Sequence, residues 1–303
     1  MNDGHGHFSD VTDKLAPGLS QGGFITNAVW FDINNDGKKD LILSLEWGGI
    51  EAYINHGGSF EKKVLTDKKG WWNFILPVDL NNDGKIDLIA GNLGLNSRLK
   101  ATDQEPVRLY YYDFDGNGKK DQILSYYLDG RELSFANKEE LEKQIPGLKK
   151  KFLYAADFAK ARFTDIFSQE DLNKADAFTA NYFSNAILLN RGDLKFDVIA
   201  MPWQAQLSSY RDAIVVDANR DSLPDILLVG NYYENNIQMG RYDADYATLL
   251  INQGKGSFRT ESLNGTQIMG QVRHIKKLTI GGKETFILAR NNDSTMVIQF
   301  KDK

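Results

Sequence analysis

An acidic pattern of nine residues occurs four times in the chain and restricts the possible folds more than any other feature. Each copy has Asp or Asn at positions 1, 3 and 5, Gly or Ser at position 6 and Asp at position 9. The copies span residues 32–40, 79–87, 113–121 and 217–225. Apolar segments typical of strands flank them, such as residues 28–31 and 41–44 around the first copy. The pattern therefore predicts loops that join two buried strands.

The polar residues of each loop have the spacing that a calcium ion requires. Alternate residues of a curled loop direct their oxygens inward, and calcium takes about six to eight of them. Side chains at positions 1, 3, 5 and 9 and the backbone carbonyl at position 7 would supply these oxygens, while glycine at position 6 permits a sharp bend. The predicted ligands are Asp32, Asn34, Asp36, Lys38 and Asp40; Asp79, Asn81, Asp83, Lys85 and Asp87; Asp113, Asp115, Asn117, Lys119 and Asp121; and Asp217, Asn219, Asp221, Leu223 and Asp225.

The distribution of charge supports a bound cation. The 303 residues include 36 basic and 41 acidic side chains, and the four loops hold 12 of the acidic ones. The other 29 acidic residues face 36 basic ones, so the excess of acid lies in the loops. Carboxylates packed this closely repel one another unless they are neutralised. An ordinary hairpin turn would explain one copy, but four copies in the same phase favour up to four calcium ions. The fourth site is expected to be weak or empty, because Ser222 replaces glycine and Pro224 stiffens the exit.

A second repeat lies out of phase with the acidic loops and predicts hairpins. Asn, Gly and a later Phe recur in residues 2–8, 55–60, 190–196 and 252–258, where Asn and Gly suit left-handed turns and Phe begins the returning strand. One acidic loop and one hairpin together connect four antiparallel strands. Such a unit is a propeller blade.

The repeats predict an all-β fold, a β-propeller of about five four-stranded blades that occupies residues 1–303 as a single domain. A helical insertion is expected at residues 137–178, where Asn137 and Glu140 form a capping-box pattern ahead of apolar residues at helical spacing. The chain begins with a hairpin and ends with strands that lack one. We therefore expect the strand around residues 7–11 to complete the C-terminal blade and so close the ring.

Loops of the form Asp-x-Asn-x-Asp-Gly-x-x-Asp between strands resemble the FG-GAP or VCBS repeats of β-propellers. The resemblance covers nearly the whole chain outside the helical insertion, although Gln21-Gly-Gly-Phe24 is the nearest trace of the Phe-Gly-Gly-Ala-Pro string. Residues 91–94, 105–109, 230–231 and 240–243 are similar to the C-terminal halves of large Bacteroidetes surface proteins, which also carry an UnbV/ASPIC-type segment that is absent here. The resemblance implies calcium-stabilised blades and an extracellular, cell-surface or periplasmic location. It implies no reaction.

The composition excludes several classes of function. Cysteine is absent and the net charge is −5, which disfavours thiol chemistry and nucleic-acid binding. No apolar run has the roughly 18 residues of a membrane helix, and the N-terminus has no signal-peptide pattern. The chain opens on a turn, as expected for a piece of a longer precursor with other domains. The four histidines form no zinc-hydrolase motif.

Two functions remain open from the sequence. The first is a non-catalytic binding or adhesion module that meets a glycan or protein ligand on one propeller face. The second is a carbohydrate-active hydrolase or lyase with two carboxylates in the channel, about 5–10 Å apart. The candidate ligand-binding residues combine flat aromatics with polar groups, although packing between blades is the favoured explanation of the aromatics. These candidates are Trp72, Asn92, Arg98, Arg241, Tyr242 and Asp243.

Overall fold

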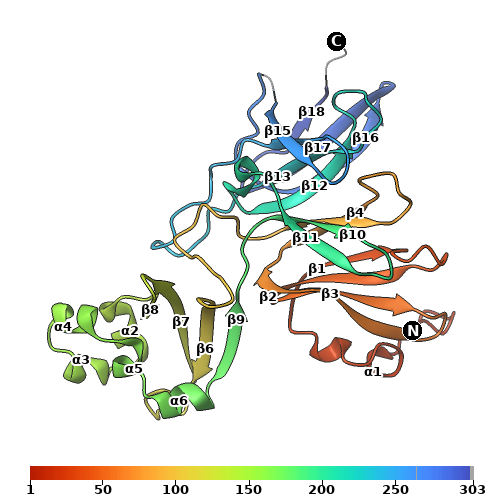
Figure 1. Cartoon of the computed structure of the whole chain (residues 1–303). Helices are drawn as coiled ribbons and strands as arrows, with labels where there is room; N and C mark the ends of the chain where they lie inside the picture. Colours follow the sequence, from red (N-terminus) through yellow and green to blue (C-terminus); the bar gives the residue numbers. More distant parts are fainter. Residues whose placement is uncertain (264, 301–303) are drawn as a thin grey trace. The chain divides into compact units, whose positions relative to one another are not determined.

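The computed structural model describes residues 1–263 and 265–300, and the chain divides into two compact units. The first unit comprises Met1–Ser97 and Ser184–Lys303, and the second comprises Arg98–Phe183. Strands account for 43% of the residues and helices for 13%, and the sheets are antiparallel. The all-β class is therefore confirmed, and Figure 1 labels most of the elements of each unit.

Two sheets of the first unit have the four-stranded plan predicted from the repeats. An acidic loop joins the first two strands of each, and an Asn-Gly hairpin joins the last two. Their middle strands are buried along their length except for the first residue of β14, which explains their apolar sequences. The strands are β4 (Phe74–Val78), β5 (Asp87–Gly91), β10 (Ala186–Asn190) and β11 (Phe196–Ala200), and β12 (Tyr210–Val216), β13 (Asp225–Gly230), β14 (Thr248–Asn252) and β15 (Phe258–Ser262).

The first sheet follows the same plan in a compressed form. It contains β1 (Phe24–Phe31), β2 (Asp40–Asn55) and β3 (Phe60–Trp71). The backbone N–H of Asn55 donates to Asp40 Oδ1 at 2.8 Å, whereas a straight strand of this length would separate its ends by about 50 Å. The strand therefore doubles back, at Trp47 with its φ of 62°. Residues 40–46 pair with β1, and residues 46, 48 and 50–55 pair with β3.

The last sheet of this unit differs from the expectation. It contains β16 (Gln271–Ile280), β17 (Lys283–Asn291) and β18 (Met296–Ile298), and within the described residues no strand from residues 7–11 joins it. The N-terminus instead forms its own turn, with the N–H of Ser9 donating to the carbonyl of Met1 at 2.9 Å. The chain continues through α1 (Thr12–Leu15) and η1 (Leu19–Gln21). In this segment, Ala16 and Leu19 pack against the first sheet.

Apolar packing explains why the N-terminal segment goes to the first sheet. Ala16 and Leu19 contact a cluster that contains Leu43, Leu45 and Tyr53 of β2. Tyr53 is fully buried there, so this face of the sheet gains its cover from residues 12–21. The prediction that residues 7–11 complete the C-terminal blade is therefore wrong.

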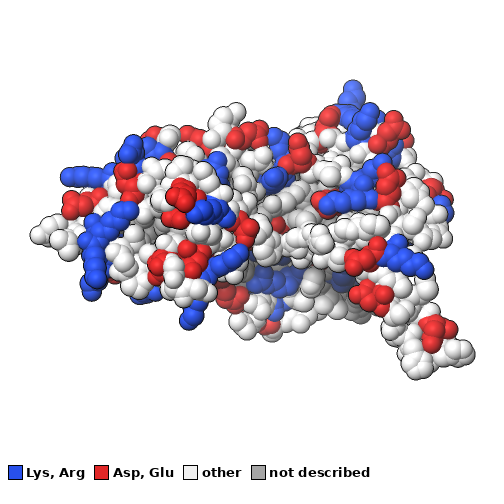
Figure 2. Space-filling model, turned by 90° about the horizontal axis from the view of Figure 1, so that it is seen from below, with Lys and Arg blue, Asp and Glu red and all other residues white. Residues whose placement is uncertain are grey.

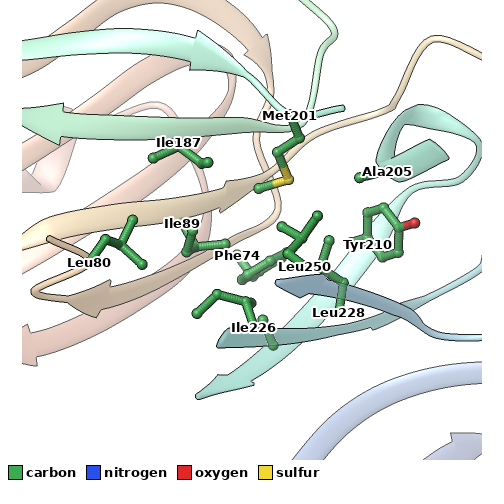
Figure 3. Packing of buried hydrophobic residues seen from close by; sticks show 11 residues of the cluster. Phe74, Leu80, Ile89, Ile187, Met201, Ala205, Tyr210, Ile226, Leu228 and Leu250 are labelled. Carbon is green, nitrogen blue, oxygen red and sulfur yellow. The ribbon is translucent and has the colours of Figure 1, made fainter. Parts of the chain in front are cut away.

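Neighbouring sheets of the first unit contact one another through their first strands. β1 contacts β4, β4 contacts β12, and β12 contacts β16, as the ribbon also shows (Figure 1). Between the second and third sheets lies a core that includes Phe74, Ile89, Ile187, Leu228 and Leu250 (Figure 3). This unit thus contains four adjoining antiparallel sheets.

The second unit is inserted between β5 and β10 and contains the expected helices. Its sheet has the order β8-β7-β6-β9, and its helices lie between β8 and β9. Asn137 and Glu140 form the predicted capping box. The elements are β6 (Val107–Tyr112), β7 (Asp121–Leu128), β8 (Arg131–Ser134), α2 (Lys138–Gln144), α3 (Leu148–Lys151), α4 (Ala155–Lys160), α5 (Phe163–Ile166), α6 (Gln169–Lys174) and β9 (Asp176–Ala180).

Candidate metal centres

All four acidic loops share one backbone conformation. Position 6 has a positive φ in every copy, at Gly37 (84°), Gly84 (80°), Gly118 (83°) and Ser222 (66°). Position 4 also has a positive φ, at Asn35 (58°), Asn82 (55°), Gly116 (71°) and Arg220 (63°). The second bend was missed from the sequence, although Asn and Gly at three of these positions tolerate it. The common conformation means that the fourth loop folds like the others despite its serine.

The side-chain oxygens of each loop curl onto its own backbone. In the first loop, Asp32 Oδ1 accepts the N–H of Asp36 at 3.0 Å, and Asp32 Oδ2 accepts that of Gly37 at 2.8 Å. Asn34 Oδ1 also accepts the N–H of Asp36, at 3.1 Å, and Asp36 Oδ1 accepts that of Lys38, at 2.9 Å. The other three loops repeat these bonds. The predicted ligand atoms are thus held on one side of each loop by backbone donors.

The aspartate at position 9 connects each acidic loop of the first unit to the Asn-Gly hairpin. Asp87 is fully buried; its Oδ2 accepts the N–H of Leu80 at 3.0 Å and its Oδ1 that of Asn190 at 2.7 Å. Asp40 and Asp225 make the equivalent pairs of bonds. The two repeats that appear out of phase in the sequence are therefore coupled in space. Burial raises the pKa of Asp87, and its two backbone hydrogen bonds oppose that rise.

The third loop brings three carboxylates together. Asp113, Asp115 and Asp121 offer oxygens that all lie within 4.8 Å of one another, and they could hold a metal ion. Burial raises the pKa of Asp121, and the charges of Asp115 and Asp113 raise it further. Oxygen donors without sulfur or imidazole suit a hard cation. Among the described residues, this loop has the most compact acidic cluster of the four.

The first two loops differ from the third by a lysine that pairs with the aspartate at position 5. Lys85 Nζ lies 3.0 Å from Asp83 Oδ2, and this side-chain hydrogen bond lowers the pKa of Asp83. Lys38 and Asp36 form the same pair at 3.3 Å. The third loop has Asn117 at this position and an aspartate at position 3 instead, so its carboxylates face one another and not a lysine.

The three acidic loops of the first unit lie at one end of its sheets. Asn35 Nδ2 of the first loop donates to the carbonyl of Gly84 in the second, at 2.6 Å. Asn252 Nδ2, next to the fourth loop, donates to the carbonyl of Leu80 at 2.7 Å. The second and fourth loops also line a common cavity of about 1220 Å³, with Asp79 and Asp217 in its wall. Backbone and amide groups thus connect neighbouring loops.

Two of the predicted ligand-binding residues lie in the core of the first unit. Trp72 and Asn92 are fully buried; Trp72 Nε1 donates to the carbonyl of Lys68 at 2.8 Å, and Asn92 Oδ1 accepts the N–H of Trp71 at 2.9 Å. These contacts are structural. Their burial agrees with the packing interpretation of the aromatic residues.

The remaining candidates have separate surroundings. Tyr242 is only 3% exposed, and its hydroxyl lies 2.8 Å from Ser97 Oγ. Arg241 is exposed, stacks over the Tyr233 ring at 3.9 Å and lies 3.9 Å from the carboxylate of Asp243. Arg98 belongs to the second unit, where its guanidinium lies 5.0 Å from the Phe135 ring centroid.

Comparisons with known proteins gave no match to a family model and none to a curated protein. None of the helices in the described part of the chain has the length and apolarity that a membrane crossing requires. The interpretation of the loops therefore depends on their own geometry.

Proposed function

We propose that this chain is a calcium-binding module of the FG-GAP or VCBS β-propeller type, which binds a glycan or protein ligand outside the cell without catalysing a reaction. The supporting observation is the common arrangement of the four loops. Each has two left-handed bends and the same four backbone hydrogen bonds to its acidic side chains. Turn geometry alone does not require acidic groups at every alternate position.

Calcium would join parts of the sheet that are distant in the sequence. In the third loop Asp113, Asp115 and Asp121 would hold the ion, with the Lys119 carbonyl as a further donor. In the other loops, the position-9 aspartate is already bonded to the hairpin in the three cases Asp40, Asp87 and Asp225. An ion bound there would neutralise the loop and stiffen its connection to the hairpin.

The order of the sheets supports the propeller part of this proposal. In a propeller the first strands of successive blades lie side by side around the axis, and β1, β4, β12 and β16 follow one another in that way. We count the four sheets of the first unit as blades. The five blades expected from the sequence would include the sheet of the second unit as the fifth.

The partner in this proposal is not nucleic acid. Figure 2 shows basic and acidic side chains interspersed over one face, without a continuous basic stripe, and the net charge is −5. A nucleic-acid surface needs clustered Lys and Arg. We place the ligand among the connections between strands, because these carry the exposed polar groups.

Calcium titration tests the proposal. Isothermal titration and thermal unfolding, in calcium and in chelator, should show saturable binding and a higher melting temperature with calcium. Magnesium should substitute poorly, because it demands stricter geometry. The variant Asp115→Asn should lose one site, whereas Asp157→Asn, on the exposed surface of α4, should bind as the parent does. Equal stability in calcium and chelator, with no heat of binding, would refute the proposal.

Glycan-array binding and product analysis test the remaining part. A binding module should retain particular glycans on the array and release no shortened products from them. Release of products would instead support the hydrolase or lyase interpretation.

A further inference from the structure

Arg211 of β12 has a buried guanidinium nitrogen without a hydrogen-bond partner. Its Nε atom is buried and has no hydrogen-bond partner, and among the described residues no carboxylate oxygen lies within 4.0 Å of its side-chain nitrogens. A charge removed from water in this way costs stability unless another group compensates it. Nη1 and Nη2 also have no partner but are not buried, so they can meet a ligand from solvent.

A second arginine lies beside the same aromatic ring. The guanidinium carbon of Arg211 lies 4.8 Å from the centroid of Tyr232, and that of Arg273 lies 5.4 Å from it. Two like charges therefore meet at one tyrosine. Burial, followed by the charge of Arg273, lowers the pKa of Arg211 to about 10, which leaves Arg211 cationic at neutral pH.

Both arginines occupy β-bulges. The pairing of β12 with β13 shifts between Tyr210 and Asp212, and the pairing of β16 with β17 shifts between Val272 and His274. A bulge takes its residue out of the regular alternation and redirects the side chain, and bulges often lie next to functional sites. The same irregularity in two neighbouring sheets places Arg211 and Arg273 on one ring.

The segment that carries the tyrosine is rigidly held. Tyr232 and Tyr242 exchange two backbone hydrogen bonds, at 2.8 and 2.9 Å. The N–H of Tyr233 donates to the Oε1 of buried Gln271 at 2.9 Å, and Arg273 Nη2 donates to the same oxygen at 3.2 Å. Hydrogen bonds thus hold the tyrosine segment and the Arg273 side chain in place, which favours binding.

The local charges leave an excess of positive charge. Glu234 lies 3.5 Å from Arg273 Nη2 and balances that side chain in part. Glu46, the other nearby carboxyl group, has its pKa raised by burial, and it is not in ion-pair contact with Arg211. The charge of Glu46 therefore acts on Arg211 only from a distance, and Arg211 has no direct ion pair beside a neighbour that has one.

This cluster lies at the end of the sheets away from the acidic loops. Arg211 is near the start of β12, whereas the fourth acidic loop follows the end of the same strand at Val216. Tyr232 follows β13, which begins at the last residue of that loop, Asp225. The cluster is therefore distinct from the candidate metal centres.

We propose that Arg211 and Arg273 bind an oxyanion of a ligand, such as a carboxylate or sulfate group of an acidic sugar, beside Tyr232. The planar fork of arginine matches the paired oxygens of such groups. The bound group supplies the direct ion pair that Arg211 lacks. This inference goes beyond the calcium proposal and does not depend on it.

Thermal unfolding with a panel of anions tests this site. The full chain is titrated with sodium glucuronate and sodium sulfate, at ionic strength matched with sodium chloride, and with glucose as an uncharged control. We expect a saturable rise in melting temperature with glucuronate or sulfate beyond that of chloride. Their relative potency distinguishes a carboxylate from a sulfate ligand, and equal effects of all three salts would overturn the proposal.

Two variants with the same change of charge make the test specific. Arg211→Gln should raise the anion concentration for half-maximal effect by at least about tenfold, and should not lower the melting temperature without anion. Arg259→Gln removes an exposed arginine of β15 that pairs with Glu261, and should respond as the parent does. An unchanged anion response in Arg211→Gln refutes the site. If Arg211→Gln does not fold, the same titration is made with Arg273→Gln, and an unchanged anion response in that variant refutes the site.

Calcium binding is measured on the same samples, so that the two proposals can fail separately. Anion titrations are run in millimolar calcium and again in chelator. Loss of the calcium response with an intact anion response would refute only the metal sites, and the reverse result would refute only the oxyanion site.

Discussion

The buried aspartate at position 9 should stabilise the first unit whether or not calcium is bound. Asp87 accepts backbone N–H groups from Leu80 and Asn190, at 3.0 and 2.7 Å. Leu80 is fully buried and Asn190 is only 4% exposed, so water cannot replace the carboxylate as an acceptor. Asp87→Ala therefore leaves two buried donors without partners.

The expected loss of stability follows from these two donors. An unsatisfied buried donor costs about 1–3 kcal/mol, so the pair should cost about 2–6 kcal/mol. Removal of the carboxylate relieves some desolvation cost, because burial raises the pKa of Asp87. We therefore expect the free energy of unfolding to fall by about 2–4 kcal/mol in chelator.

Asp83→Ala is the matched comparison within the same loop. Asp83 is a position-5 residue whose side chain is 33% exposed and pairs with Lys85, and exposed ion pairs contribute about 1 kcal/mol or less. This variant should be near the parent in chelator but lose the gain from calcium. Urea denaturation of both variants, in chelator and in calcium, measures the difference. A cost below about 1 kcal/mol for Asp87→Ala in chelator would contradict the coupling between loop and hairpin.

Two further predictions concern backbone strain and pH. Ser222 has a φ of 66°, so Ser222→Gly should raise the free energy of unfolding by about 1 kcal/mol, and thermal unfolding should show it; a lower melting temperature would argue against strain. Burial raises the pKa of Asp245 to about 6, so its protonated form stabilises the folded state, and that stability is lost as the pH rises from about 4 to 6. Relative to the parent, Asp245→Asn should gain up to about 3 kcal/mol between pH 4 and 7 in urea titrations; parallel pH profiles would rule this out.

The repeats in the sequence were sufficient to predict the local structure of the chain. Gly37 and its counterparts adopt the predicted bends, and Asn137 begins a helix with a capping box, because short-range spacing determines both features. Loops and hairpins join the strands of the second and third sheets as expected. Nine-residue loop patterns and hairpin patterns of six or seven residues contain the information for these contacts.

Long-range contacts were not accessible in the same way. The bond from Asn190 to Asp87 spans 103 positions, so no local pattern indicates it. Residues 7–11 could be matched to a missing strand, but the apolar face of β2 determined where the N-terminus packs. A tryptophan such as Trp72 is equally compatible, in the sequence alone, with a position in the core or on a binding surface. Its burial in the structure places it in the core. The sequence around Arg211 does not indicate its role, because the β-bulge that it occupies depends on how β12 pairs with β13.

The insertion of residues 98–183 between β5 and β10 has a consequence for folding. Ala90 pairs with Ala186, so the centre of this sheet can form only after the intervening chain has left the ribosome. A flexible loop of that length would slow the pairing through its closure entropy. An insert that folds first would hold its two ends together and reduce that entropy. Substitutions in the core of α2–α6 should therefore delay assembly of a sheet to which they do not belong.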